Sequence, residues 1–335
     1  MQLPPSSQLR NPRPPGRGLF FAPAASRVSL PLAIPPRKEP RLLEMILSAA
    51  ALAGTAATAA VFNKRFRRLK SALRDATDHQ GHLQRSLSLA YANIAALDMA
   101  RSGQTPVFDI DFRSDSGEDL YLYELFARQR TGYFIECGAF DGYTGAVTYA
   151  LEALGWTGLL IEPHPDRAQD CRERRPASRV VQAAVSAAGS TGTIELVSVE
   201  DPHSAHSGAY SYLAGTQAPR VKRIEERGSG RKLAVPLSTM DEVLAQSPPP
   251  RVDLAVIDVE GHEEKLFAGF DLARWKPRVL LVEEHPMGKR PELTAAISAR
   301  GYVAVEAIGV NRVWIHRDEA ALLARASAMS SHHVF

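Results

Sequence analysis

From residue 117 onward, short apolar runs alternate with stretches whose apolar residues recur at three- and four-residue spacings. The apolar runs predict strands, and the spaced stretches predict amphipathic helices. Predicted strands cover residues 132–137, 157–163, 179–185, 192–199, 251–261, 278–285, 302–309 and 311–318, and predicted helices cover 117–129, 146–155 and 167–175. This alternation predicts a doubly wound, mostly parallel α/β sheet. The last two strands predict an antiparallel C-terminal hairpin.

The first hundred residues follow a different pattern. Residues 1–40 hold ten of the 23 prolines and show no periodicity, which predicts a disordered basic arm. Leu and Ala recur at helical spacing across residues 66–100, so we expect residues 41–100 to form an Ala-rich helical segment. We expect one main domain at residues 101–320 and a tail at residues 321–335.

An uncharged segment at residues 45–62 precedes a basic cluster at residues 64–70. Eighteen uncharged residues reach the lower limit for a membrane span, but eight of them are Ala and insertion would be weak. The alternatives are a membrane anchor, a helix on the membrane surface and a soluble Ala-rich helix. A secretory signal peptide is disfavoured because the basic cluster follows the apolar run. We expect a cytoplasmic protein, with membrane contact through residues 45–70 at the inner face as one alternative.

Composition narrows the class of protein. Apolar residues make up 45% of the chain and charged residues 23%, which is typical of a soluble globular protein. Residues 1–70 carry 12 Lys and Arg against two Asp and Glu, whereas the rest carries 28 against 35. The predicted domain is therefore mildly acidic, which argues against a nucleic-acid partner. The two cysteines, Cys137 and Cys171, exclude a disulfide scaffold and suit a reducing compartment.

The first candidate binding loop lies in GYFIECGAFDGYTG, residues 132–145. Its residues of interest are Glu136, Gly138, Ala139, Asp141 and Gly142. The glycines allow a tight turn close to a ligand, and the following helix would present free N–H groups. The stretch has no complete G-x-G-x-x-G, which disfavours a nicotinamide-dependent oxidoreductase. Taken alone, the loop is explained equally well as a plain strand-to-helix turn.

Glu162 ends the next predicted strand, 24 residues after Gly138. In doubly wound sheets, ligands bind beyond the C-terminal ends of the strands. An acid at the end of the second strand can accept both hydrogen bonds from a ribose diol. The alternative is a surface carboxylate beside Pro163. In combination with the glycine loop, Glu162 predicts an adenosine-containing ligand.

Two later strands also end in chemically useful residues. Strand alternation places Asp258 and Glu260 on one face at the mouth of the site. A carboxylate there would act as a general base, orient an acceptor hydroxyl or bind a cation. His285 follows the next strand, and a histidine suits a base near neutral pH, although a structural histidine explains it too. The spacing of these residues with Glu283 matches no recognised ligand motif, so we expect no metal.

A long polar connection at residues 200–217 is a candidate lid, because connections of this length are often functional. The residues that would then contact the substrate are Tyr210, Ser211 and Tyr212. A solvent-exposed loop is the alternative.

Several segments occur in a characteristic order: GEDLYLYELF, GYFIECGAFDGYTG, LEALGWTGLLIEPHP, QAAVSAAGSTGTIEL, VPLSTMDEVL, VDLAVIDVEGHEEKLFAGF and PRVLLVEEH. Over roughly residues 116–316, the chain resembles the FkbM family of S-adenosylmethionine-dependent methyltransferases. The family's first motif is close to D-V-G-A-N-x-G. This chain has Glu136 in place of the Asp and Phe140 in place of the Asn. The family often has Lys before I-D-V-E-G, where this chain has Val256.

The resemblance implies a class I, Rossmann-like methyltransferase domain with S-adenosylmethionine as cofactor. The resemblance implies that Glu136, Gly138 and Gly142 line the methionine end of the cofactor, with Asp141 nearby, and that Ala139 also belongs to the cofactor site. It implies Glu162 at the ribose, and Ala184, within residues 183–186, at the adenine. The implied reaction is O-methylation of a hydroxyl on a sugar, polyketide or related small-molecule or glycan acceptor. The departures at Phe140 and Val256 motivate an alternative, a degenerate methyltransferase-like binding or scaffold protein tethered at a membrane.

Overall fold

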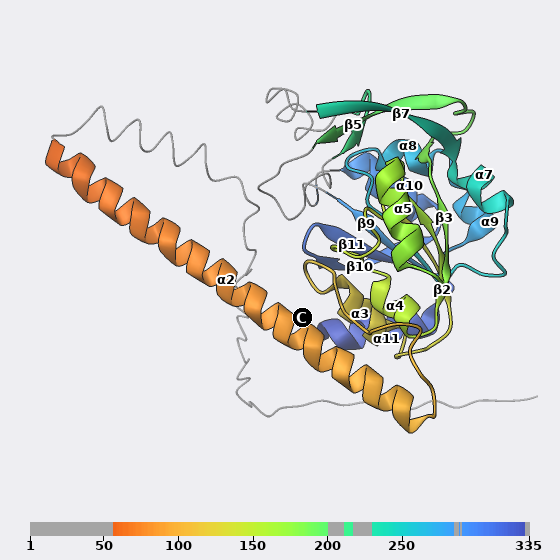
Figure 1. Cartoon of the computed structure of the whole chain (residues 1–335), viewed down its shortest axis with the longest axis horizontal. Helices are drawn as coiled ribbons and strands as arrows, with labels where there is room; N and C mark the ends of the chain where they lie inside the picture. Colours follow the sequence, from red (N-terminus) through yellow and green to blue (C-terminus); the bar gives the residue numbers. More distant parts are fainter. Residues whose placement is uncertain (1–55, 200–210, 217–229, 285–287, 289, 332–335) are drawn as a thin grey trace, which may run out of the picture. The chain divides into compact units, whose positions relative to one another are not determined.

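Seven strands form the central sheet of the computed structural model, which describes residues 56–199, 211–216, 230–284, 288 and 290–331 (Figure 1). The strands are β1 (Tyr133–Cys137), β2 (Thr157–Ile161), β3 (Ser178–Val181), β8 (Leu254–Ile257), β9 (Val279–Glu283), β10 (Tyr302–Ile308) and β11 (Asn311–His316). Their order is β10-β11-β9-β8-β1-β2-β3. The strands from β3 to β9 pair in parallel, whereas β11 runs antiparallel to β9 and β10. The predicted doubly wound sheet with an antiparallel C-terminal hairpin is confirmed.

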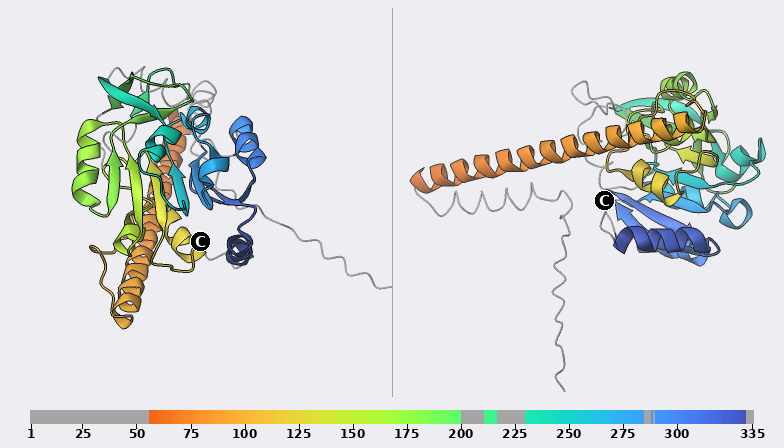
Figure 2. Two further views of the ribbon diagram at one scale, coloured as in Figure 1. Left: turned by 90° about the vertical axis from the view of Figure 1, so that its right-hand side faces the viewer. Right: turned by 90° about the horizontal axis from the view of Figure 1, so that it is seen from below.

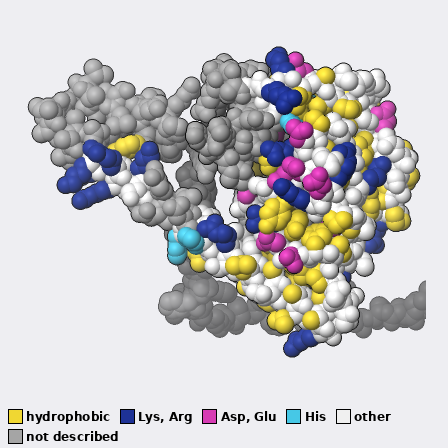
Figure 3. All heavy atoms as spheres, in the orientation of Figure 1, with side chains coloured by type: hydrophobic (Ala, Val, Ile, Leu, Met, Phe, Trp, Pro, Cys, Tyr) yellow, Lys and Arg dark blue, Asp and Glu magenta, His cyan; other side chains and the backbone are white. Residues whose placement is uncertain are grey.

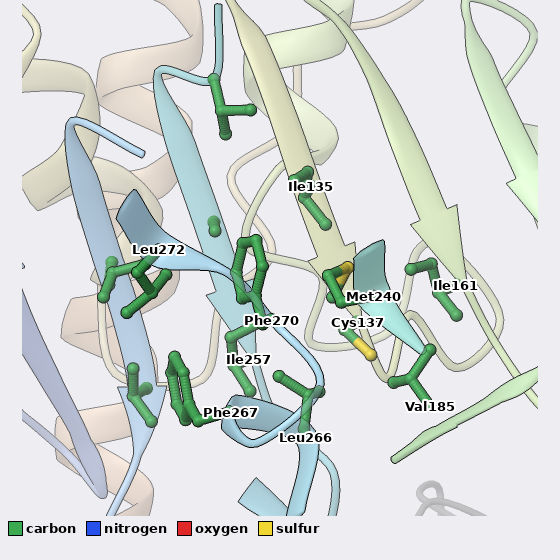
Figure 4. Close-up of a cluster of buried hydrophobic side chains, with 14 of the residues drawn as sticks. Ile135, Cys137, Ile161, Val185, Met240, Ile257, Leu266, Phe267, Phe270 and Leu272 are labelled. Carbon is green, nitrogen blue, oxygen red and sulfur yellow. The ribbon is translucent and has the colours of Figure 1, made fainter. Parts of the chain in front are cut away.

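Helices cover both faces of this sheet (Figure 2). One face is covered by α7 (Met240–Ala245), α8 (Glu263–Phe267), α9 (Leu272–Trp275) and α10 (Pro291–Ala299), and the other by α3 (Glu118–Leu125), α4 (Tyr149–Ala153), α5 (Pro165–Arg174) and α11 (Ala320–Ser331). Alternate strand residues face opposite sides of the sheet. Ile135 and Ile257 belong to the apolar cluster that includes Leu266 of α8 (Figure 4). Phe134 and Val256 belong to the cluster on the other side. Burial on both faces explains the continuous apolar runs in β8 and β9.

A second, four-stranded sheet was not expected from the sequence. It contains β4 (Ala184–Ser186), β5 (Thr193–Val199), β6 (Tyr212–Leu213) and β7 (Gly230–Thr239) in the order β4-β7-β5-β6. The single strand predicted at 179–185 is divided, because β3 pairs with β2 and β4 pairs with β7. The strand predicted at 192–199 corresponds to β5, which pairs antiparallel with β6 and β7.

The two ends of the described chain are helical. Helix α2 (Ala56–Arg101) is longer than the pattern at 66–100 predicted. Where a tail was expected from residue 321, α11 buries Leu322 and Ala326 against the sheet. Within the described ranges, no helix has both the length and the apolar character needed to cross a bilayer. The predicted arm at residues 1–40 and the first part of the segment 45–70 lie outside the described residues.

The sheet has its topological switch point between β1 and β8. From β1 the chain continues outward through β2 to β3, and from β8 it continues outward on the other side to β9. Ligands of doubly wound sheets bind in the crevice beyond the strand ends at this point. The C-terminal ends of β1, β2, β8 and β9 therefore define where to look for a site.

Candidate active site

The ends of β1 and β8 meet in direct backbone contact. The Asp258 N–H donates a hydrogen bond of 3.0 Å to the Cys137 carbonyl. Gly138 has a φ of +86°, and a Cβ added there would lie 1.7 Å from the Asp258 carbonyl oxygen. Only glycine permits this approach. The glycine loop and the I-D-V-E-G segment, which lie far apart in the sequence, therefore form one packed unit.

Gly142 is constrained from a different side. Its φ is +74°, and an added Cβ would lie 3.1 Å from the Arg175 side chain and 3.2 Å from the Cys171 backbone. These contacts belong to α5 and the residue that follows it. The second glycine of the loop thus allows close packing of α5, while Ala139 is buried between the two glycines.

Glu136 holds the loop to the start of α4. Its carboxylate accepts hydrogen bonds from the Val147 N–H (3.0 Å) and the Thr148 hydroxyl, and it lies 3.6 Å from the Arg175 guanidinium. Arg175 is fully buried and also forms an ion pair with Glu152 at 2.8 Å. The Glu136 carboxylate therefore bonds to the residues at the start of α4 and lies beside Arg175. Its predicted place at the methionine end of a cofactor depends only on its position near the end of β1.

Asp141 stabilises the turn that follows. Its carboxylate accepts the Thr144 N–H at 2.7 Å and the Tyr143 N–H at 3.0 Å, and it pairs with Arg174. Burial alone would raise the pKa of Asp141, but the Thr144 and Tyr143 N–H groups and Arg174 outweigh it and lower the pKa. Asp141 is thus an ionised, internally bonded residue of the loop.

Glu162 links the end of β2 to the glycine loop. One carboxylate oxygen accepts the Phe140 N–H at 3.0 Å and the other accepts the His164 N–H at 2.8 Å. Burial raises the pKa of Glu162 to about 7, although these two N–H groups oppose the rise. Each oxygen keeps a further lone-pair direction, so the carboxylate offers the two acceptors that the hydroxyls of a ribose diol require.

Two residues at these strand ends have strained backbones. Phe140 has a φ of +50° and Glu260 a φ of +55°, in the left-handed region that residues with a Cβ seldom adopt. Asn tolerates this region better than Phe, which explains the Asn of the D-V-G-A-N-x-G pattern. Here the Arg167 guanidinium lies 4.6 Å above the Phe140 ring. Strain at the ends of both β1 and β8 is typical of a functional site.

Carboxyl groups gather where β8 and β9 end. Glu283 is buried at the end of β9, and burial raises its pKa far above the ordinary value of 4.5, assisted by the charges of Asp258, Glu260 and Glu263 and by a hydrogen bond with Asp258. Glu283 therefore carries a proton at neutral pH. Strand alternation does not bring Asp258 and Glu260 together, because β8 ends at Ile257 and Glu260 lies in a turn.

Sequence reasoning missed His262. The His262 ring is buried and lies 3.0 Å from the Ser186 hydroxyl and 3.3 Å from the Thr216 hydroxyl. Burial, together with the charge of Lys265, lowers the pKa of His262 to about 4, so the ring is neutral. The sequence feature that could have identified His262 is its position directly after I-D-V-E-G.

Glu263 begins α8, where a negative charge favours the helix N-terminus, and it also has a second role. Its fully buried carboxylate accepts the Gly261 N–H at 2.9 Å and the Val259 N–H at 3.3 Å, and it pairs with Arg290. Glu263 therefore holds the turn that contains Glu260.

The remaining predicted residues lie in or near the second sheet or cannot be placed. Ala184 is buried in β4 beside β7, and Tyr212 is buried in β6 beside β5. Ser211 precedes Tyr212 and is half-buried. Tyr210 and His285 lie outside the described residues. In the part of the chain that the structure describes, no three His, Cys, Asp or Glu residues gather in a way that would hold a metal ion.

Comparison with known proteins adds a family match. The model of the Methyltransferase FkbM domain matches residues 136–304, half of the chain. No curated protein matches. Similar solved structures include the C-terminal domain of precorrin-6Y C5,15-methyltransferase from Rhodobacter capsulatus (13% identity, TM-score 0.29, covering 59% of this chain and 84% of that one). Another is a TehB-like SAM-dependent methyltransferase from Corynebacterium glutamicum (11%, 0.31, covering 69% and 98%). A third is a fibrillarin pre-rRNA processing protein from Methanococcus jannaschii (11%, 0.33, covering 60% and 76%).

Proposed function

Because the chain belongs to the FkbM methyltransferase family, in which S-adenosylmethionine is the cofactor, we propose that it methylates a hydroxyl group of a small molecule or glycan. A sugar or polyketide hydroxyl is the acceptor class we favour. The observation that carries this proposal is the cluster of Asp258, Glu260 and Glu283 beside the Gly138 turn. A hydroxyl must lose a proton when it is methylated, and this cluster offers an acceptor for that proton at the switch point of the sheet.

The residues at the ends of β1 and β2 fit the cofactor. Glu162 offers two carboxylate oxygens for the ribose hydroxyls, and the turn from Gly138 to Gly142 brings backbone close to the same edge. Ala184, at the start of β4, is our candidate for the adenine side. When bound, S-adenosylmethionine supplies a methyl group on a positively charged sulfur.

We assign the proton acceptor to Asp258. Glu283 holds a proton and shares a hydrogen bond with Asp258, which leaves Asp258 as the ionised member of the pair. Asp258 would take the proton of the acceptor hydroxyl, while the methyl carbon would pass to that oxygen and the electron pair of the broken carbon–sulfur bond would remain on sulfur. Glu260 would orient the acceptor hydroxyl. Tyr210, Ser211 and Tyr212 would line the acceptor side, and His285 is the second candidate base.

Calorimetric binding of S-adenosylmethionine and of its demethylated product tests the cofactor site. Glu162→Gln should weaken binding about 10–100-fold, because an amide cannot accept the same pair of hydrogen bonds. Glu173→Gln, an exposed carboxylate change on α5, is the matched control and should bind as the wild type does. Equal affinity of the two variants would remove Glu162 from the site.

Transfer of a labelled methyl group to a panel of hydroxyl-bearing sugars and polyketides tests the reaction. Asp258→Asn should lower kcat about 10²–10⁴-fold with unchanged cofactor affinity, since only the proton acceptor is lost. Tight cofactor binding without transfer to any hydroxyl in the panel would instead favour the alternative of a binding protein.

A further inference from the structure

Helix α2 exposes a line of large apolar side chains. Among the described residues, nine large apolar side chains are exposed, and six of these are on α2. Leu83 is 58% exposed and Leu97 is 64% exposed, with Leu69, Leu87 and Ile94 exposed on the same line. A contiguous exposed apolar surface on a soluble domain marks an interaction site more often than chance exposure.

The spacing of this line is that of a coiled coil. Steps of four and three residues alternate through Leu69, Leu73, Ala76, Gln80, Leu83, Leu87, Ala90, Ile94, Leu97 and Arg101. We call this line the α2 seam. A strict repeat of 3.5 residues keeps a stripe facing a partner helix along a left-handed supercoil, whereas a helix that packs on a globular core follows 3.6.

The α2 seam is distinct from the face that attaches the helix to its own domain. That attached face carries Ser88, Ala95 and Met99, all buried, and Tyr91, whose ring lies 6.1 Å from the ring of Phe112. These residues occupy other positions of the heptad than the seam does. The helix is therefore held in place by one apolar face and presents a second one.

We propose that the α2 seam pairs with the α2 seam of a second copy of this chain. Of the ten seam positions, five are Leu and one is Ile, and an apolar stripe of this kind can pack against the same stripe of a second copy. A shallow hollow of about 230 Å³, lined by Ile94, Leu97, Asp98 and Arg101, lies at the end of the seam. Such a hollow is where a side chain of a facing helix would insert.

The charges along α2 favour an antiparallel pair. Lys64, Arg65, Arg67, Arg68 and Lys70 are exposed near the N-terminal end of the seam with no acid between them, and basic side chains gather on this part of the helix (Figure 3). A parallel pair in register would set these five cations against the same five of the partner. An antiparallel pair places them beside the partner's opposite end, where Asp98 and Arg101 together carry no net charge.

The oligomeric state of the full chain tests the proposal, measured by sedimentation equilibrium over a range of concentrations. The wild type should be a dimer, and Leu83→Glu/Leu87→Glu should weaken the dimer at least tenfold. Leu89→Glu is the matched control, because Leu89 is 63% exposed on α2 but lies off the seam. It should remain dimeric. A monomeric wild type, or equal weakening by the seam and control variants, would overturn the proposal.

Two further measurements test whether each variant is still folded and whether the paired helices are antiparallel. Calorimetric cofactor binding by each variant should match the wild type, which separates loss of the dimer from loss of the fold. Leu69→Cys should form no disulfide with itself under mild oxidation, since antiparallel helices keep the two Leu69 positions apart. An intermolecular disulfide at this position would overturn the antiparallel orientation.

Discussion

Gly138 lies where the fold requires a residue without a side chain, for two reasons. Its φ of +86° and its approach to the Asp258 carbonyl are separate demands, and glycine meets both. The first demand concerns backbone conformation alone, and the second concerns the packing of β1 against β8. The chain offers a way to separate them, because Gly189 has a φ of +81° but no atom near the position of its missing Cβ.

We expect Gly138→Ala to lower the free energy of unfolding by more than about 3 kcal/mol, because the new methyl group collides with backbone. Gly189→Ala should cost only the left-handed strain, about 1–2 kcal/mol. Urea unfolding of both variants measures the difference. Similar losses would mean that the contact with Asp258 adds nothing beyond backbone strain.

Glu283 gives a prediction whose sign depends on pH. Its pKa is raised in the folded protein, so the folded state holds a proton that the unfolded state loses above the ordinary value of 4.5. The stability that depends on this proton is present below pH 4.5 and is lost as the pH rises. Glu283→Gln, which mimics the protonated acid, should gain about 1.4 kcal/mol relative to wild type for each pH unit above 4.5.

The neighbouring carboxyl group is the control. Glu284 is also buried but pairs with the half-buried Arg312, so Glu284→Gln should destabilise the protein by removing the charge of this ion pair. Unfolding experiments between pH 5 and pH 8 compare the two variants. A Glu283→Gln variant less stable than wild type at pH 8 would contradict the protonated state.

At the scale of elements, His262 connects three parts of the chain. Its ring touches Ser186 at the end of β4 and Thr216 after β6, and the residue itself immediately precedes α8. The depressed pKa of His262, about 4, means that the unfolded state takes up the proton first as the pH falls. Above pH 6.5 the ring is neutral in both states, so its full contribution is present there and is lost as the pH falls toward 4.

We therefore expect wild-type stability to fall by about 1.4 kcal/mol per pH unit from this group between pH 6.5 and 4. His262→Gln should be less steep over that range, and the exposed His79→Gln on α2 should follow the wild type. Identical pH profiles for His262→Gln and wild type would exclude a buried neutral ring.

The strands of the central sheet were predictable because apolar runs in the local sequence mark them. β8 and β9 are continuous apolar runs, and Glu162 could be placed at the edge of the sheet because it follows such a run. The second sheet was not predictable in this way. β7 mixes charged, apolar and proline residues, and its pairing with β5 and β4 depends on contacts between distant segments. The break between β3 and β4 has the same origin, since Val181 and Ala184 have different partner strands.

Within the site, sequence position predicted which residues reach the edge of the sheet but not where their side chains point. Glu136 lies near the end of β1 as predicted, yet its carboxylate is held by the residues just before α4 and by Arg175. The burial of Glu283 and the bridging role of His262 depend on tertiary contacts, which no local pattern records.

At the scale of the whole molecule, the expected domain boundary at residue 101 divides a packed core. Ala95 and Met99 of α2 are buried with Phe112, Leu120 and Tyr123. The C-terminal part of α2 is therefore part of the domain and not only a segment that precedes it.

A chain that begins at Gly103 should lose about 3 kcal/mol or more in stability, since large buried side chains lose their packing partners. A chain that begins at Ala56 keeps α2 and should retain the wild-type free energy of unfolding and cofactor affinity. Calorimetric melting of the two truncations tests this expectation. Equal melting temperatures would show that α2 packs on the domain without stabilising it.

The contact between Gly138 and Asp258 also bears on how such an enzyme can change its substrate. Because the cofactor loop and the proposed proton acceptor share a backbone contact, any change that moves the backbone of one should also move the other. The second sheet is linked to this region through Thr216, whose hydroxyl lies 3.3 Å from the His262 ring. Libraries that seek a new acceptor should therefore randomise Ser211 and Tyr212 and leave Thr216 and the ends of β1 and β8 untouched.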